Sequence, residues 1–208
     1  MLIFKFLKLK YIRFWRFVIS FYYRYSLTNK NFTIISNNCW GGFIYQKYNL
    51  PYKTPFLGLF IPAPCYIKLL ENFDKIMDTS IDFISEGKYP CSNGKKYPIG
   101  ILGEDIEIHF LHYKTPEEAL TKWNQRKLRI NKNNMLVKFS EIDFCTPDLI
   151  ERFDKLPFKN KLCITVNQYK HLKSVITFPA AHNKTETFEE WKYKIPNFTT
   201  LINNLDKK

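Results

Sequence analysis

The stretch that decides the fold runs from Ile99 to Val137 and reads IGILGEDIEIHFLHYKTPEEALTKWNQRKLRINKNNMLV. Residues 106–110 alternate between apolar and polar side chains, which is the period of two that a half-buried strand shows. Residues 135–139 predict a further strand, and a segment with a strong helix start signal lies between the two. The whole stretch is therefore predicted to fold as strand, helix, strand.

The helix in this stretch is predicted to begin at Thr115, whose hydroxyl can accept a backbone N–H that the first turn leaves unpaired. Pro116 suits the first helical position, and Glu117 and Glu118 lie favourably near the positive end of the helix dipole. Asparagine-rich residues 131–134 end the helix. These signals are local, so they predict the helix start without any tertiary structure.

The rest of the chain repeats this alternation. The residue pattern predicts further strands at 32–35, 57–61 and 162–166, and helices at 43–48, 66–77 and, after a second Thr-Pro-acid start, 146–153. Residues 85–100 are expected to form an irregular loop, and residues 170–208 carry no clear pattern. Strands that alternate with helices predict an α/β fold, a layered Rossmann-like domain with a largely parallel sheet. We assign it to residues 31–208, after a separate segment formed by residues 1–30.

The formal net charge of +13 is unevenly distributed along the 208 residues. Residues 1–30 hold seven lysines and arginines and no acidic residue. Residues 2–24 predict one basic amphipathic helix, with aromatic and aliphatic side chains on one face and cations on the other. Such a helix is typical of proteins that attach to an anionic membrane surface. Packing of the apolar face on the body of the protein or on a partner is the alternative.

This helix is not expected to cross a membrane. The uncharged run from Phe17 to Tyr23 is far shorter than the roughly 20 residues that a span needs, and no cleavage site for a signal peptide follows it. We expect a cytoplasmic protein, peripheral to the inner face of the cell membrane. Nucleic acid is not expected as a partner, because the aromatic face suits lipid better than a groove.

The cysteines and histidines do not predict a metal site. The five cysteines are odd in number and never spaced as Cys-x-x-Cys, which disfavours a zinc site or a disulfide framework and fits a reducing cytosol. His109 and His112 stand near acidic residues, but side chains three positions apart on a strand face opposite sides. No Asp-x-Asp motif occurs. We therefore expect neither a metal nor a cofactor.

A polar turn follows the strand predicted at 32–35 and leads into a helix. A Gly-containing turn of this kind presents backbone N–H groups at a helix N-terminus, where anions bind. It is neither a P-loop nor a dinucleotide fingerprint, because the glycine spacing differs. An ordinary turn with its tryptophan in the core remains the alternative. The candidate phosphate ligands are Ser36, Asn37, Asn38, Trp40, Gly41 and Gly42.

Two further sets of residues could serve a phosphorylated substrate. Arg126 and Arg129 could neutralise a diphosphate, arginine through bidentate hydrogen bonds, although cations at a helix end are often only solvated. His112 or Asp105 could act as a general base towards a sugar hydroxyl. Alternatively, Asp105 merely begins the strand and His112 belongs to a loop.

These residues resemble a known family. The turn at 36–42, Leu57-Gly58-Leu59-Phe60, Glu104-Asp105-Ile106 and His112-Tyr113-Lys114, together with Glu118-Ala119, Trp123 and residues 126–131, are similar to the bacterial domain of unknown function 1919 family. Its members are commonly labelled exopolysaccharide or capsular polysaccharide biosynthesis proteins. The resemblance covers about residues 30–180. It implies an α/β fold and a role in surface-glycan assembly, and it adds Trp123 and Asn131 to the candidate ligands.

The sequence therefore favours a surface polysaccharide biosynthesis protein, and within that class a metal-independent glycosyltransferase. Its donor would be a nucleotide sugar and its acceptor a glycan or a lipid-linked sugar. An acyl or other group transferase that modifies the glycan is one alternative, and a non-enzymatic scaffold of the assembly machinery is another.

Overall fold

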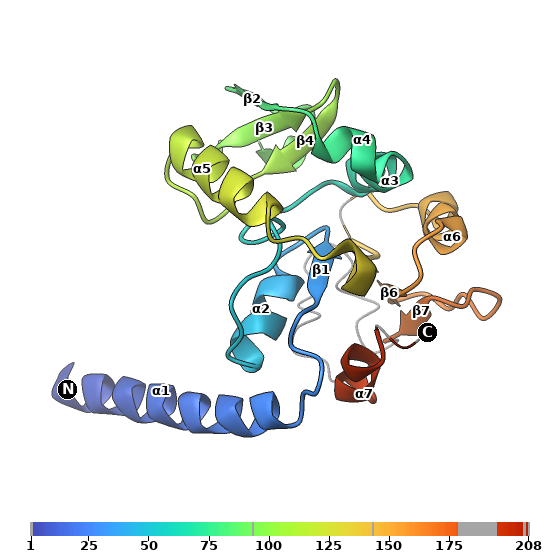
Figure 1. Cartoon of the computed structure of the whole chain (residues 1–208). Helices are drawn as coiled ribbons and strands as arrows, with labels where there is room; N and C mark the ends of the chain where they lie inside the picture. Colours follow the sequence, from blue (N-terminus) through green and yellow to red (C-terminus); the bar gives the residue numbers. More distant parts are fainter. Residues whose placement is uncertain (1, 93, 143, 179–194, 206, 208) are drawn as a thin grey trace.

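The computed structural model describes residues 2–92, 94–142, 144–178, 195–205 and 207 (Figure 1). The helices are α1 (Leu2–Tyr25), α2 (Trp40–Lys47), α3 (Ala63–Glu71), α4 (Phe73–Met77), α5 (Pro116–Lys127), α6 (Pro147–Lys155), α7 (Phe198–Asn203) and two 3-10 turns, η1 (Pro90–Ser92) and η2 (Lys132–Asn134). The strands are β1 (Thr33–Ser36), β2 (Ile81–Ile84), β3 (Ile99–Leu102), β4 (Ile106–His109), β5 (Met135–Ser140), β6 (Lys161–Thr165) and β7 (Val175–Thr177).

The strands form two separate sheets. A four-stranded sheet has the order β1-β5-β6-β7, and all of its pairs are parallel. A three-stranded sheet has the order β2-β3-β4, and its pairs are antiparallel. The prediction of an α/β fold with a largely parallel sheet is therefore confirmed.

The parallel sheet is covered on both faces. Side chains of β1, β5 and β6 alternate between two cores, because successive residues of a strand point to opposite faces. Ile35, Phe139 and Cys163 join the core that holds α3, α6 and the antiparallel sheet. Ile34 and Leu162 belong to the core on the other face, together with residues of α2 and α7. Burial on both faces explains why these strands are continuous apolar runs.

The strand, helix and strand predicted within residues 99–139 correspond to β4, α5 and β5. All three elements form, but β4 and β5 lie in different sheets. The chain turns at Gly103, in a left-handed conformation with φ of +66°, and this turn pairs β4 with β3 as an antiparallel hairpin. The short turn supplies β4 with its partner before the chain reaches α5.

In the part of the chain that the structure describes, the segment predicted as a strand at 57–61 makes one isolated bridge, between Phe60 and His109. Its backbone nevertheless joins the two sheets. The N–H of Phe60 donates to the carbonyl of His109 (2.8 Å), and the N–H of Ile61 donates to the carbonyl of Asn37 at the end of β1 (2.8 Å). This crossing segment fixes the antiparallel sheet against the parallel one.

Several other boundaries differ from the predictions. The helix predicted at 66–77 is broken at Asn72, where φ is −128°, into α3 and α4. The helix predicted at 43–48 begins three residues earlier, at Trp40. The sequence pattern missed β2, and it missed β3 as a separate strand, which begins inside the loop predicted at 85–100. In the unassigned C-terminal region it missed β7 and α7.

The two predicted Thr-Pro helix starts are confirmed. The hydroxyl of Thr115 accepts the N–H of Glu118 (3.2 Å) at the start of α5, and the hydroxyl of Thr146 accepts the N–H of Leu149 (3.4 Å) at the start of α6. In both helices proline occupies the first turn. Each cap satisfies one of the N–H groups that a helix N-terminus leaves unpaired.

The N-terminal segment forms α1, which leads away from the rest of the molecule (Figure 1). The side chains of residues 2–9, 12, 13 and 16 lie outside the described ones, and with them much of the predicted segregation into two faces. Among the described residues, no helix has the length and apolar character needed to cross a membrane.

Candidate functional site

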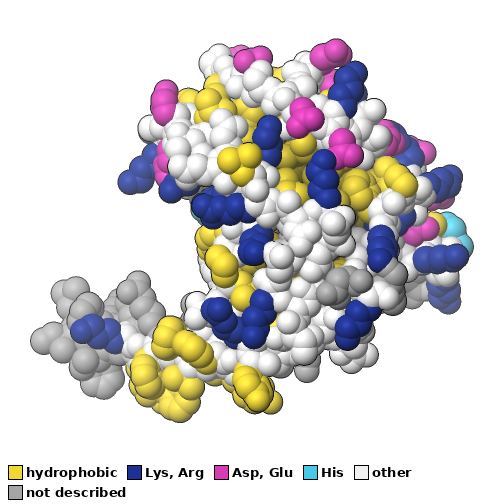
Figure 2. Space-filling model, viewed as in Figure 1, with side chains coloured by type: hydrophobic (Ala, Val, Ile, Leu, Met, Phe, Trp, Pro, Cys, Tyr) yellow, Lys and Arg dark blue, Asp and Glu magenta, His cyan; other side chains and the backbone are white. Residues whose placement is uncertain are grey.

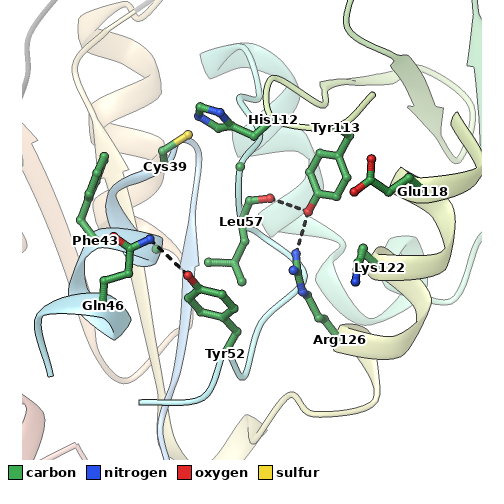
Figure 3. A pocket seen from close by; sticks show the side chains of 12 residues that line it. Cys39, Phe43, Gln46, Tyr52, Leu57, His112, Tyr113, Glu118, Lys122 and Arg126 are labelled. Atoms are coloured by element: carbon green, nitrogen blue, oxygen red, sulfur yellow. Dashed lines mark hydrogen bonds between the residues drawn. The ribbon is translucent and has the colours of Figure 1, made fainter. Parts of the chain in front are cut away.

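A pocket of about 340 Å³ lies between α2 and α5 (Figure 3). Four parts of the chain form its walls: α2 with its N-cap residue Cys39, the segment 52–58, the turn that follows β4, and the exposed side of α5. Its lining residues are Cys39, Gly42, Phe43, Gln46, Tyr52, Leu57, Gly58, His112, Tyr113, Glu118, Lys122 and Arg126. The volume lies near the lower end of the range for small-molecule sites.

The local sequence explains how α5 presents its cations. Trp123 is buried and packs against the rings of Phe56 and Phe110, with centroid distances of 5.3 and 6.3 Å. Lys122 and Arg126 are four residues apart and therefore lie on the same side of the helix, one turn from each other. Burial of Trp123 fixes the rotation of α5, which leaves these two cations in the pocket wall.

Arg126 is held in place by a chain of hydrogen bonds (Figure 3). Its Nη1 donates to the hydroxyl of Tyr113 (2.7 Å), which in turn donates to the carbonyl of Leu57 (2.7 Å). Burial raises the pKa of Tyr113 and outweighs the lowering effect of Arg126, so this phenol remains protonated. The guanidinium also lies 5.5 Å from the ring of Tyr52. Among the described residues, no carboxylate forms an ion pair with Arg126.

The opposite part of the pocket is aromatic and weakly polar. Figure 3 shows Phe43, Gln46 and Cys39 on one side of Leu57, and Arg126, Lys122 and Glu118 on the other. The amide of Gln46 donates to the hydroxyl of Tyr52 (3.2 Å). Burial raises the pKa of the Cys39 thiol to about 11, and the thiol donates to the carbonyl of Leu59 (3.6 Å). Cys39 is therefore protonated at neutral pH and is a poor nucleophile.

His112 is exposed and borders the same pocket. Its backbone N–H donates to the carbonyl of Gly58 (3.0 Å). Gly58 has a φ of +65°, and a Cβ at this position would lie 3.1 Å from the Cβ of His112. Glycine is needed at this point, because only glycine adopts this conformation readily and leaves room for the histidine.

The amino-acid sequence matches a family model and the sequence of a relative. A family model described as Domain of unknown function (DUF1919) matches residues 10–207. The chain belongs to the DUF1919 family. A relative from Haemophilus influenzae (strain ATCC 51907 / DSM 11121 / KW20 / Rd), named as an uncharacterized protein, is 35% identical over 159 residues, which cover 76% of this chain and 73% of the relative.

The match to the DUF1919 model begins inside α1, well before residue 30, where the motifs behind the resemblance begin. At least the second half of α1 thus belongs to the family sequence. Neither description names an activity, so a function for this DUF1919 chain has to be argued from its geometry.

The pocket of the DUF1919 chain brings together three of the residues proposed from sequence, Gly42, His112 and Arg126. Asp105 lies elsewhere: it precedes β4, whereas His112 follows it, and its carboxylate pairs with Lys68. β4 belongs to the antiparallel sheet, so it does not end at the carboxyl edge of the parallel sheet, where α/β proteins commonly bind ligands. The six residues from Ile106 to Leu111, which include all of β4, separate the two proposed bases.

The remaining candidates on and after α5 have structural contacts. Arg129 donates from Nη1 to the carbonyl of Tyr52 (3.3 Å) and does not line the pocket. Asn131 is not among the lining residues either: its N–H donates to the hydroxyl of Thr33 (2.8 Å) and its side-chain amide to the carbonyl of Asn31 (3.0 Å). Trp123 forms part of the core.

The turn at 36–42 is mostly buried. Trp40 packs edge-on against Phe198 (5.4 Å), as the alternative interpretation of this turn expects. A Cβ on Gly41 would lie 3.1 Å from Ile34, so this glycine lets α2 approach β1 closely. Ser36 donates to the carbonyl of Asn38 (2.8 Å), and the side chain of Asn38 accepts the N–H of Trp40 (3.2 Å). These contacts build the start of α2.

Asn37 is fully buried, and among the described residues neither atom of its amide group has a hydrogen-bond partner. A buried amide without partners is costly. It lies at the carboxyl end of β1, and it is not among the residues that line the pocket.

The sequence interpretation missed Phe43, Gln46, Tyr52, Tyr113 and Lys122 as lining residues. Lys122 could have been found, because the i, i+4 spacing places it beside Arg126. The aromatic residues carry no such signal, because they come from segments that only the folded chain brings together.

A second polar cluster, on β4, was also missed. Glu107 and His109 are fully buried on the same side of the strand. The imidazole Nε2 of His109 lies 2.6 Å from a Glu107 carboxylate oxygen, and its Nδ1 lies 3.1 Å from the hydroxyl of Tyr97. The N–H of Lys88 donates to the other oxygen of Glu107 (2.6 Å). Burial lowers the pKa of His109, against the opposing effect of Glu107.

Proposed function

We propose that the pocket between α2 and α5 binds the phosphate groups of a nucleotide sugar and that the chain is a metal-independent glycosyltransferase. The observation that carries this proposal is the Arg126 guanidinium. Tyr113 orients it, no described carboxylate neutralises it, and Lys122 lies one helical turn away in the same wall.

An arginine that is oriented by a neighbour and forms no ion pair with a described carboxylate is suited to binding phosphate. The guanidinium presents five N–H donors in a planar fork that matches phosphate oxygens, and one of them is engaged with Tyr113. A second cation, Lys122, could balance the remaining charge of a diphosphate. The aromatic rings of Phe43 and Tyr52 would face the base or the sugar ring, for which stacking is a common mode of contact.

His112 is the favoured general base for the acceptor hydroxyl. It borders the pocket, and histidine is the side chain that most readily exchanges a proton near neutral pH. Asp105 is a weaker candidate for this role, because Lys68 holds its carboxylate at the other end of β4.

The biological setting belongs to the same proposal. The sequence motifs resemble proteins labelled as exopolysaccharide or capsular polysaccharide biosynthesis proteins, so we place the reaction in surface-glycan assembly on the cytoplasmic side of the membrane. The acceptor would be a glycan or a lipid-linked sugar, and no cofactor is required. An acyl-transfer reaction through a Cys39 thioester is disfavoured, because the pKa of this thiol is raised to about 11.

The test is a binding panel of nucleotide sugars against the full chain, followed by calorimetry on any ligand that raises the melting temperature. We expect one nucleotide class to bind. Arg126→Ala should weaken that binding about 10- to 100-fold, the loss of a hydrogen bond to a charged group. Lys122→Ala should weaken it less.

Lys155→Ala is the matched control, because it removes one exposed cation from α6, outside the pocket. It should bind like the unmodified chain. Equal binding by Arg126→Ala, or no binding of any nucleotide by a folded sample, would contradict the proposal and favour a scaffold or a different donor. Transfer of an acyl group in place of sugar would favour the other enzyme class.

A further inference from the structure

Residues 11–25 of α1 carry most of the large apolar side chains that the described part of the molecule exposes. Nine of the thirteen lie between Tyr11 and Tyr25, and four lie elsewhere. Six of the nine follow the spacing i, i+3, i+4, i+7, i+11 and i+14, which forms one stripe along a helix. These six are Tyr11, Phe14, Trp15, Val18, Tyr22 and Tyr25. Figure 2 shows hydrophobic side chains gathered on this arm.

The C-terminal end of α1 is firmly attached to the body. The ring of Tyr23 packs edge-on against Tyr48 (6.0 Å), and the ammonium of Lys47 lies 4.6 Å above it. Arg24 donates to the carbonyl of Asn49 (2.7 Å). After the helix, the amide of Asn203 donates to the carbonyl of Ser26 (3.1 Å) and accepts the N–H of Thr28 (2.9 Å). These contacts hold the C-terminal end of α1 against the body of the protein, so the position of the stripe relative to the body is fixed at that end.

We propose that α1 binds the surface of an anionic phospholipid bilayer and lies in the plane of its headgroups. Contiguous exposed apolar surface of this kind marks an interaction site. Residues 1–30 hold seven cations and no acidic residue, so the complementary surface is anionic as well as apolar. A bilayer with acidic headgroups offers both properties at once.

Other occupants fit the stripe less well. A second copy of the chain would bring the same seven cations against one another, and like charges oppose such pairing. Nucleic acid would complement the charge, but it offers no apolar phase for the ring of Trp15 or Phe14. Aromatic side chains with polar tips, such as tyrosine and tryptophan, are favoured at the level of the headgroups.

The attachment also places the pocket near the bilayer. α1 docks beside Tyr48, at the C-terminal end of α2, while Phe43 and Gln46 of the same helix line the pocket. α2 has eight residues and is about 12 Å long. A lipid-linked acceptor would then lie within reach of the pocket. This last step rests on the proposed function, whereas bilayer binding by α1 does not.

The test is flotation of the full chain with vesicles of mixed phosphatidylglycerol and phosphatidylcholine, and with vesicles of phosphatidylcholine alone. We expect binding to the mixed vesicles, at least about tenfold weaker binding to the neutral ones, and release by raised salt. Phe14→Ser plus Tyr22→Ser should lower binding at least about tenfold. Leu128→Ser alters an apolar side chain that is 85% exposed at the C-terminal end of α5, outside α1. It is the matched control and should bind normally.

The tryptophan emission provides an independent readout. Trp15 is 45% exposed, whereas Trp40 and Trp123 are buried. Mixed vesicles should shift the emission to shorter wavelength, and a Trp15→Phe variant should lose that shift. Equal binding to both vesicle types, or unchanged binding by the double serine variant, would overturn the proposal. So would self-association or tight DNA binding that depends on the same residues in a chain that does not float with vesicles. Nucleotide binding by the pocket is measured separately, so either proposal can fail without the other.

Discussion

Two histidines three residues apart occupy opposite environments. His109 is fully buried, and contacts with Glu107 and Tyr97 engage both of its ring nitrogens. His112 is exposed at the rim of a pocket whose arginine, among the described residues, makes a hydrogen bond through one of its five N–H donors. Buried polar side chains whose hydrogen bonds are made with one another, such as His109 and Glu107, stabilise the fold. Polar side chains at a cavity, such as His112 and Arg126, can instead form hydrogen bonds with a ligand.

The largest expected effect comes from breaking the buried cluster. Glu107→Leu would leave both the imidazole of His109 and the N–H of Lys88 without their acceptor. We expect a loss of about 3 kcal/mol in the free energy of unfolding, measured by urea denaturation. Glu104→Leu, at an exposed position of the neighbouring turn, should change it by less than about 0.5 kcal/mol. Equal effects of the two variants would contradict the structural role of the cluster.

A glycine pair tests the contact that positions His112. Gly58→Ala should cost about 2 kcal/mol, because alanine is strained at a φ of +65° and its Cβ would lie 3.1 Å from that of His112. Gly94 has a similar φ of +68°, but a Cβ there would meet no described atom within 4 Å. Gly94→Ala should therefore cost only the strain, about 1 kcal/mol. If both variants lose the same free energy of unfolding, the close contact between residue 58 and His112 contributes nothing to stability.

The depressed pKa of His109 predicts how stability depends on pH. Above its ordinary value of 6.5 the imidazole is neutral in both the folded and the unfolded chain. As the pH falls below 6.5, the unfolded chain takes up a proton first, so the folded state loses stability until the pH passes the folded pKa. The loss is about 1.4 kcal/mol per unit of separation between the two values. Urea midpoints between neutral and acidic pH should fall more in the unmodified chain than in His109→Gln.

The smallest effect on stability is expected at the other histidine. His112→Ala should change the free energy of unfolding by less than about 0.5 kcal/mol, since the side chain is exposed. If His112 is the general base, the same variant should lower the transfer rate about 10²- to 10⁴-fold once the donor is known. His171→Ala, which alters another exposed histidine, is the control for both measurements. An unchanged rate would remove His112 from the proposed mechanism.

The candidate site could be predicted in part. Arg126 and His112 were identifiable because cations near a helix end and a histidine after a strand are visible in the sequence. Tyr52 and Tyr113 were not, although they contact and orient Arg126. Tyr52 is far from Arg126 in the chain, and Tyr113 precedes it by 13 residues, ahead of the start of α5. Both contacts depend on how these segments pack, which the periods of helices and strands do not predict.

Local interactions let the sequence by itself determine the helix starts at Thr115 and Thr146, the strand periods and the α/β class. Only the tertiary structure decided which sheet each strand joins: β4 pairs with β3, and the segment 57–61 crosses between the sheets with a single bridge. It also decided that the turn at 36–42 is mostly buried, while Arg126 and Lys122 face a cavity. The physical reason is that capping and periodicity depend on residues a few positions apart, whereas strand pairing and exposure depend on the packing of the whole chain.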